Sequence, residues 1–169
     1  IDEGEIHKMA TMEVLKQHPY LEQDVTHGTR IVSRPSEGYS RVMLVMAQKT
    51  LVRRLMQFLV DAKSTVEQIV LGSESLFVWY THFQKVDETK TVLLANFNSN
   101  YLDMIIIRQR DLVFTRGVLF EVDIKPEDPR VLEQIKASID HFRKEGGQSI
   151  DKIIICGSPA RLGPLQLKC

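Results

Sequence analysis

The stretch Thr91–Arg116, TVLLANFNSNYLDMIIIRQRDLVFTR, decides which fold we expect for this chain. Apolar runs at residues 92–94 and 102–107 flank the polar segment Asn96–Asn100, and β-branched residues dominate the second run. Runs of this kind are typical of strands, and a short polar segment between them is typical of a tight turn. A second turn at residues 109–111 leads into a third apolar run. The stretch therefore predicts three consecutive antiparallel strands.

The overall composition excludes several classes of protein. The 169 residues contain 22 basic and 22 acidic side chains, so bulk charge attracts neither nucleic acid nor an anionic membrane. No apolar run approaches the roughly 20 residues that cross a bilayer, and the start lacks the features of a secretory signal. We expect a cytosolic protein in which Cys156 and Cys169 are free thiols.

The N-terminal third predicts a small α+β unit. Apolar residues at helical spacing indicate an amphipathic helix over Glu5–Gln17. Short strands are expected at Thr29–Ser33 and Arg41–Ala47, joined as a hairpin, and a second amphipathic helix at Lys49–Ala62. On that helix, Arg53 and Arg54 are expected on the solvated face. Helix, hairpin and helix together form one unit over residues 1–62.

The next segment predicts a strand and a helix. Thr65–Leu71 has the composition of a strand. Ser73 is a candidate N-cap for a helix that should end near Val86. Trp79 and Phe83 are separated by one helical turn, so they share one side of this helix. We expect them to belong to the core rather than to a ligand platform.

A further helix and strand are expected after the three-stranded stretch. Asp128-Pro129 is a helix-start signal, and Gly146-Gly147 is a stop. The strand that follows is Asp151–Cys156. We expect the core face of the helix to carry Leu132, Ile135, Ile139 and Phe142. Three strands, a helix and a strand form the first part of a ribonuclease-H-like fold.

Several short motifs resemble one family in the right order. They are Val45–Lys49, Glu74–Leu76, Asp111–Arg116, Ile135–Arg143 and Asp151–Leu162. Each is similar to the corresponding motif of PilM, the actin-like cytoplasmic protein of type IV pilus assembly, and of the related cytoplasmic domain of the type II secretion protein GspL. The resemblance covers nearly the whole chain.

The resemblance implies an α/β (α+β) fold, part of an actin-like ATPase fold, with a ribonuclease-H-like subdomain and a small α+β insertion subdomain. Residues 1–62 would form the insertion-type subdomain. Residues 63–88 would be a strand–helix remnant of the first ribonuclease-H-like subdomain, and residues 89–169 an incomplete second one. It also implies truncation at both ends, with the family's first phosphate loop before Ile1 and its last elements after Cys169.

The family's second phosphate loop reads Asp-x-Gly-x-x-x-Thr, in which the aspartate organises hydrated magnesium and the glycine lets backbone N–H groups approach phosphate. Aligning on the strands places Ala95, Phe97 and Tyr101 at those three positions. A shift of one residue places Asn96 and Asn98 at the first two. Neither alignment supplies a carboxylate, so we expect no ATP hydrolysis.

The residues that the resemblance assigns to nucleotide binding are expected to be vestigial; they are Asn96, Asn98, Ser99, Asn100, Gly157 and Ser158. The asparagines are also typical turn formers, and the Gly157 segment is typical of an ordinary strand-to-helix turn. We expect no resident cofactor, although ATP with magnesium stays open. The histidines are scattered, so no metal site is expected. An acidic group at Glu121, Asp123, Glu127 and Asp128 is explained by a solvated loop with one helix cap.

The function implied by the resemblance is that of a non-catalytic cytoplasmic scaffold in a type IV pilus or type II secretion platform. It would bind the short cytoplasmic tail of a bitopic inner-membrane protein, PilN in pili, and so lie peripheral to that membrane. A homodimer stays open, and nucleic acid is not expected as a partner. The alternative is a nucleotide-binding actin-like ATPase whose cleft is completed by segments outside this chain. For an unrelated α/β enzyme we find no constellation of catalytic residues.

Overall fold

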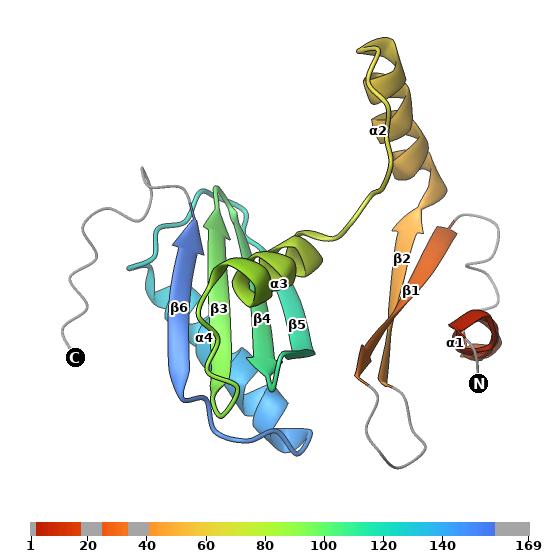
Figure 1. Ribbon diagram of the computed structural model, residues 1–169. Coiled ribbons are helices and arrows are strands. Elements are labelled where there is room, and N and C mark those ends of the chain that lie inside the picture. The colour runs from red at the N-terminus through yellow and green to blue at the C-terminus, as the bar shows by residue number, and fades with distance from the viewer. Residues whose placement is uncertain (1–2, 18–24, 34–40, 158–169) are drawn as a thin grey trace. The chain divides into compact units, whose positions relative to one another are not determined.

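The computed structural model describes residues 3–17, 25–33 and 41–157, which form ten helices and strands (Figure 1). The chain divides into two compact units, which we name unit 1 (Ile1–Ile69) and unit 2 (Val70–Cys169). The border after Ile69 lies beyond residue 62, where we placed the end of the insertion-type subdomain. The further division into 63–88 and 89–169 stays a prediction.

Unit 1 contains the predicted helix, hairpin and helix. They are α1 (Glu3–Gln17), β1 (Val25–Ser33), β2 (Arg41–Gln48) and α2 (Lys49–Asp61). The two strands pair antiparallel, with one shift of register between Ile31 and Ser33. Local hydrophobic patterning was therefore sufficient to place all four elements.

Polar and ring contacts join α1 to β1. Nδ1 of His7 and Oγ1 of Thr29 lie 2.7 Å apart in a hydrogen bond. The His7 ring also stacks on the ring of His27, with centroids 5.4 Å apart. None of the side chains described in unit 1 is buried. This unit thus has a defined chain path but encloses no dry core in its described part.

Unit 2 is built on a four-stranded sheet. Its strands are β3 (Thr91–Asn98), β4 (Tyr101–Arg108), β5 (Asp111–Leu119) and β6 (Lys152–Gly157), in the order β5-β4-β3-β6. β3, β4 and β5 form the predicted antiparallel meander, and β6 pairs parallel with β3. The expected strand before residue 157 is confirmed, and Cys156 within it is a free thiol. Cys169 lies outside the described residues.

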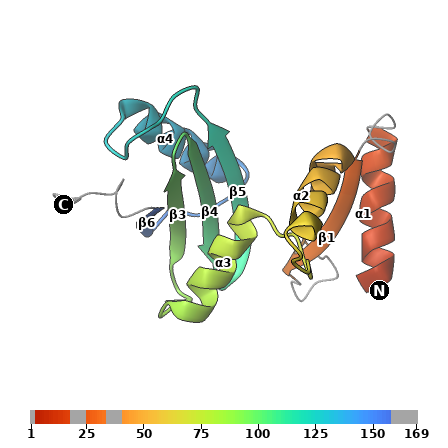
Figure 2. The same ribbon diagram turned by 90° about the horizontal axis from the view of Figure 1, so that it is seen from above.

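Helix α4 (Pro129–Lys144) covers one face of this sheet (Figure 2). As predicted, Asp128 caps it, since its carboxylate accepts a hydrogen bond from the Arg130 N–H at 2.9 Å, and the helix ends before Gly146. Of the expected core face, Ile135 and Phe142 are buried and Ile139 packs against the core, whereas Leu132 is wrong, because it is 53% exposed and Val131 is buried in its place. The buried positions of α4 are Val131, Ile135, Ser138 and Phe142, which lie along one stripe of the helix. They pack on Leu93, Ala95, Phe97, Leu102, Met104 and Ile106 of β3 and β4.

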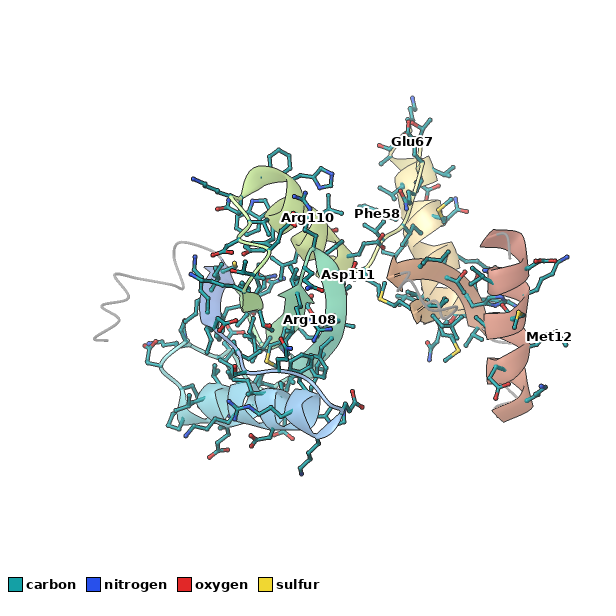
Figure 3. The ribbon with its side chains drawn as sticks, turned by 60° about the horizontal axis from the view of Figure 1, so that its bottom comes forward. Met12, Phe58, Glu67, Arg108, Arg110 and Asp111 are labelled. Atoms are coloured by element: carbon teal, nitrogen blue, oxygen red, sulfur yellow. The ribbon has the colours of Figure 1, made fainter. Side chains whose placement is uncertain are left out.

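Helix α3 (Gly72–Phe83) lies on the opposite face of the sheet and packs against β4 (Figures 1 and 2). Its Leu76 and Tyr80 are buried. Burial, and secondarily the charge of Asp87, raises the pKa of the Tyr80 phenol. At the C-terminal end of α3, Arg110 from the β4–β5 turn donates from Nη2 to the carbonyl oxygen of Thr81 at 3.1 Å (Figure 3).

Three expectations around α3 are wrong. Residues 64–71 form no strand, because an apolar run becomes a strand only where a neighbouring backbone pairs with it, and the described residues supply none there. Ser73 is not the N-cap; Leu71 is, and it makes no side-chain cap bond. Trp79 and Phe83 are exposed rather than part of the core, because the sheet covers only the side of α3 that carries Leu76.

Candidate functional site

The structure brings the predicted nucleotide-binding residues to one edge of the sheet. Asn98 and Tyr101 close the β3–β4 turn, and Phe97 pairs with Gly157 at the end of the neighbouring parallel strand. The carboxyl ends of β3 and β6 therefore meet, which is where open α/β sheets place ligands. Asn96, Asn98, Ser99, Asn100 and Gly157 belong to this edge. Ser158 lies outside the described residues.

The two possible alignments of the phosphate-loop motif place their first two residues on opposite faces of the sheet. Ala95 and Phe97 belong to the core cluster under α4 and are buried, so neither side chain can reach a ligand. Asn96 is half-buried on the α3 side, and Asn98 is exposed. At the first two motif positions, only the alignment through the asparagines thus leaves side chains that a ligand could contact; Tyr101, the third position of the other alignment, pairs with Asn98 and is exposed.

The β3–β4 turn is tied to the segment that follows β5. Ser99 has φ +50°, the left-handed conformation that two-residue hairpin turns require. Its hydroxyl donates to Oδ1 of Asp123 at 2.6 Å, and its carbonyl oxygen accepts from the Ile124 N–H at 3.0 Å. Both bonds fix the tip of the turn against residues 120–124.

Asn100 makes a matched pair of bonds to the same segment. Its side-chain amide donates to the carbonyl oxygen of Phe120 at 3.0 Å, and its own carbonyl oxygen accepts from the Phe120 N–H at 2.7 Å. An asparagine that satisfies a neighbouring backbone in this way is a turn former. For Asn100 the structure therefore supports the turn-forming interpretation.

Asp123 is a residue of this edge that the sequence analysis did not connect with it. Its carboxylate is bound by the Ser99 hydroxyl, so a negative charge stands at the turn where a phosphate loop would hold an anion. Like charges a few ångströms apart repel each other. The predicted meander could have indicated that Asp123 lies near the β3–β4 turn. In a meander the end of β5 returns beside the start of β4, and here Leu119 pairs with Tyr101.

Gly157 occupies a position that only glycine fits. Its φ is +146°, and a Cβ added there would lie 2.6 Å from the carbonyl oxygen of Phe97. L-residues rarely adopt this conformation, and the contact is to backbone, which cannot rotate away. The glycine that the resemblance assigned to an adenosine loop is therefore required by the packing of β6 on β3.

A second carboxylate, Asp103, lies near the same edge on the α3 side. It pairs across the strands with Asn96 and is 6% exposed. Burial raises the pKa of Asp103, and burial together with the Asp103 charge raises that of Tyr101. Oδ2 of Asp103 lies 3.4 Å from the position that a Cβ at Gly72 would take, at the start of α3. Asp103 thus lies beside the start of α3.

Across the sheet, Asn96 is next to Cys156, whose thiol pKa is also raised by burial. A raised pKa keeps a thiol protonated and makes it a poor nucleophile. The described residues contain no group of three or more His, Cys, Asp or Glu side chains arranged to hold a metal. In the same residues, no helix has both the length and the apolar character needed to cross a bilayer.

Comparison with known proteins identifies the fold. No protein-family model and no curated protein matches this chain. A solved structure, the PilM–PilN type IV pilus biogenesis complex, matches with a TM-score of 0.72 at 12% identity, over 96% of this chain and 58% of that one. This chain has part of an actin-like ATPase fold.

A second solved structure supports the same assignment. It is a Bacteroides thetaiotaomicron protein with an actin-like ATPase fold and unknown function, which matches with a TM-score of 0.51 at 9% identity, over 94% of this chain and 53% of that one. The fold predicted from the PilM resemblance is thus confirmed. The chain spans little more than half the length of the two proteins that it resembles.

Proposed function

We propose that this chain is a non-catalytic scaffold of a type IV pilus or type II secretion platform. It would bind the short cytoplasmic tail of a bitopic inner-membrane protein and lie at the cytoplasmic face of that membrane through this partner. The observation that carries the proposal is the likeness, over 96% of the chain, to a protein solved as a PilM–PilN complex.

The β3–β4 turn supports the non-catalytic part of the proposal. The Ser99 hydroxyl and the Asn100 amide are bonded to residues of the chain itself. Asp123 adds a negative charge that disfavours phosphate. The position that should hold a magnesium-organising aspartate is occupied by buried Ala95 or by uncharged Asn96. Each of these features weakens the contacts that transfer of a phosphoryl group depends on.

A peptide titration tests the scaffold. The peptide is the cytoplasmic tail of a PilN-like bitopic protein from the same organism, labelled with a fluorophore, and a scrambled version of the tail serves as the control. We expect saturable binding by fluorescence anisotropy for the native tail only. Equal binding of both peptides, or of neither, would exclude the scaffold role.

The alternative function is nucleotide binding, and one observation favours it. The β3–β4 turn and Gly157, which correspond to the phosphate and adenosine loops of the family, meet at the same edge of the sheet. Calorimetric titration with Mg–ATP decides between the two functions. Under the scaffold proposal no heat of binding is expected.

A matched pair of variants sharpens that titration. Asn98→Glu adds a charge at the exposed end of β3, whereas Gln148→Glu adds one before β6, at the opposite edge. Magnesium-dependent binding that Asn98→Glu abolishes and Gln148→Glu leaves intact would establish the nucleotide site and favour the nucleotide-binding alternative.

A further inference from the structure

Helix α2 carries an apolar stripe that unit 1 does not cover. Leu51, Leu55 and Phe58 follow one another at spacings of four and three residues, so they line one side of the helix. All three are exposed, Phe58 to 70%, and no residue of α2 is buried. Figure 3 shows Phe58 projecting from the helix. The stripe is therefore a preformed apolar surface.

Cationic side chains accompany this stripe. Lys49, Arg53 and Arg54 lie on α2, and Lys63 follows its C-terminal end. Asp61, the helix's acidic residue, accepts a hydrogen bond from Nε2 of Gln57 at 2.7 Å. Although the whole chain has no net charge, α2 has three basic residues against one acidic residue. The helix is thus locally cationic.

The geometry of unit 1 leaves the stripe accessible. β2 leads into α2 without an intervening loop, since the strand ends at Gln48 and the helix begins at Lys49. Figure 1 shows α2 extending beyond the end of the β1–β2 hairpin rather than lying across its face. Within unit 1, the hairpin therefore presents the helix without covering its apolar side.

We propose that α2 binds directly to an anionic lipid surface, with its apolar stripe in the interface and its basic side chains against the headgroups. A helix with Leu and Phe on one side and Lys and Arg on the other lies in the plane of such a surface. The 13 residues of α2 span about 20 Å, enough to place the three apolar side chains at one depth. This contact is with lipid itself, so it goes beyond tail capture and does not rest on it.

Vesicle co-sedimentation of the whole chain tests the proposal. The vesicles contain phosphatidylcholine alone or phosphatidylcholine with phosphatidylglycerol, an anionic lipid. A basic residue near an anionic surface contributes roughly a fivefold increase in affinity, so we expect binding at least about tenfold tighter to the anionic vesicles. The double variant Arg53→Glu/Arg54→Glu should lose this preference.

Phe58→Asp tests the apolar part and has a close control. Phe83 on α3 is 75% exposed, similar to Phe58, but belongs to unit 2. Phe58→Asp should weaken vesicle binding at least about tenfold, whereas Phe83→Asp should leave it unchanged. Lys136→Glu/Lys144→Glu, at two exposed positions of α4, is the control for the charge reversal. Far-UV circular dichroism verifies that each variant is folded.

Several outcomes would overturn the proposal. They are the absence of co-sedimentation, equal binding to both kinds of vesicle, or equal losses in the α2 variants and their controls. A dimer of the lipid-free chain that Phe58→Asp dissociates, with no vesicle binding, would assign the stripe to a second copy instead. The tail-peptide titration, repeated with Phe58→Asp, keeps the two proposals apart, because loss of vesicle binding with intact peptide binding affects only the lipid contact.

Discussion

Units 1 and 2 contain the same kinds of element but differ in what those elements enclose. Every described side chain that is buried belongs to unit 2, where β3 and β4 lie between α3 and α4. Unit 1 has a hairpin with one shift of register and two helices, yet none of its described side chains is fully buried. Patterning is thus sufficient to form elements, whereas a dry core requires that both faces of a sheet be covered.

This difference predicts how the units respond to mutation. Burial of apolar side chains supplies most of the stability of a fold, so unit 2 should be the more stable part of the chain. Trp79, the single tryptophan, lies in unit 2, and its fluorescence therefore reports unfolding of that unit. The variants below probe the comparison in order of expected effect.

Removal of a buried phenylalanine should have the largest effect. Phe97 is almost completely buried under α4, so Phe97→Ala should lower the free energy of unfolding of unit 2 by about 3–5 kcal/mol, because it leaves a cavity. Phe58→Ala, at an exposed position of unit 1, should change it by less than about 0.5 kcal/mol. Urea titrations of both variants measure the difference in unfolding free energy. Trp79 fluorescence follows the unfolding of Phe97→Ala, and circular dichroism follows that of both variants. Similar losses in the two variants would contradict it.

Alanine substitutions at two glycines should have the next largest effect on stability. Gly157→Ala in β6 should cost about 1–3 kcal/mol, because the backbone conformation and the Phe97 carbonyl both oppose a Cβ. Gly28→Ala in β1 meets nothing within 4 Å and should be neutral or slightly stabilising. Thermal unfolding of both variants provides the measurement. If Gly157→Ala were neutral, the close approach of β6 to β3 would be wrong.

Helix capping should distinguish α4 from α2 by a smaller amount. Hydrogen bonds from the side chain and then the backbone N–H of Arg130 lower the pKa of Asp128. The stabilisation that goes with a lowered pKa is complete above the ordinary value of 3.8 and is lost as pH falls through the lowered one. Asp128→Ala should therefore lower the melting temperature at pH 7 and have less effect in strong acid. Gln48→Ala at the N-cap of α2, which makes no side-chain cap bond, should have no effect at either pH.

The smallest effect should come from the buried carboxylate of unit 2. Since burial raises the pKa of Asp103, the folded state binds this proton more tightly than the unfolded state. The stability of the wild type relative to Asp103→Asn should therefore rise as pH falls from 7 through the raised pKa, and level off below 3.8. Urea titrations at several pH values measure it. A difference that does not vary with pH would show that Asp103 is solvated.

The sequence predicted those parts of the fold whose signals are local. Alternation of apolar runs and turns placed the meander, and Asp128-Pro129 with Gly146-Gly147 delimited α4, because caps and stops act within a few residues. The prediction of a strand at Thr65–Leu71 was wrong, because a strand depends on a partner elsewhere in the chain. The prediction that Trp79 and Phe83 belong to the core was also wrong. Periodicity shows which residues share a side of a helix but not which side is covered.

The assignment of residues to a nucleotide site stays a prediction, and the interactions of those residues were not predicted. The structure places the asparagines of the β3–β4 turn and Gly157 at one edge of the sheet. The bond between Ser99 and Asp123 joins residues 24 apart, and no local pattern in the sequence marks it. Asp103 was missed because it lies within an apolar run, and its burial follows from the position of α3.

The pairing of β6 with β3 has a consequence for the order of folding. β3, β4 and β5 are joined by turns of two residues, whereas the Thr91 N–H donates to Oδ2 of Asp151 across 60 residues of chain. Closing a long loop is entropically costly and slow compared with forming a hairpin. The meander and α4 should therefore form first, and β6 should dock last. Pulsed hydrogen exchange during refolding should detect this as later protection of the amides of β6 than of β4.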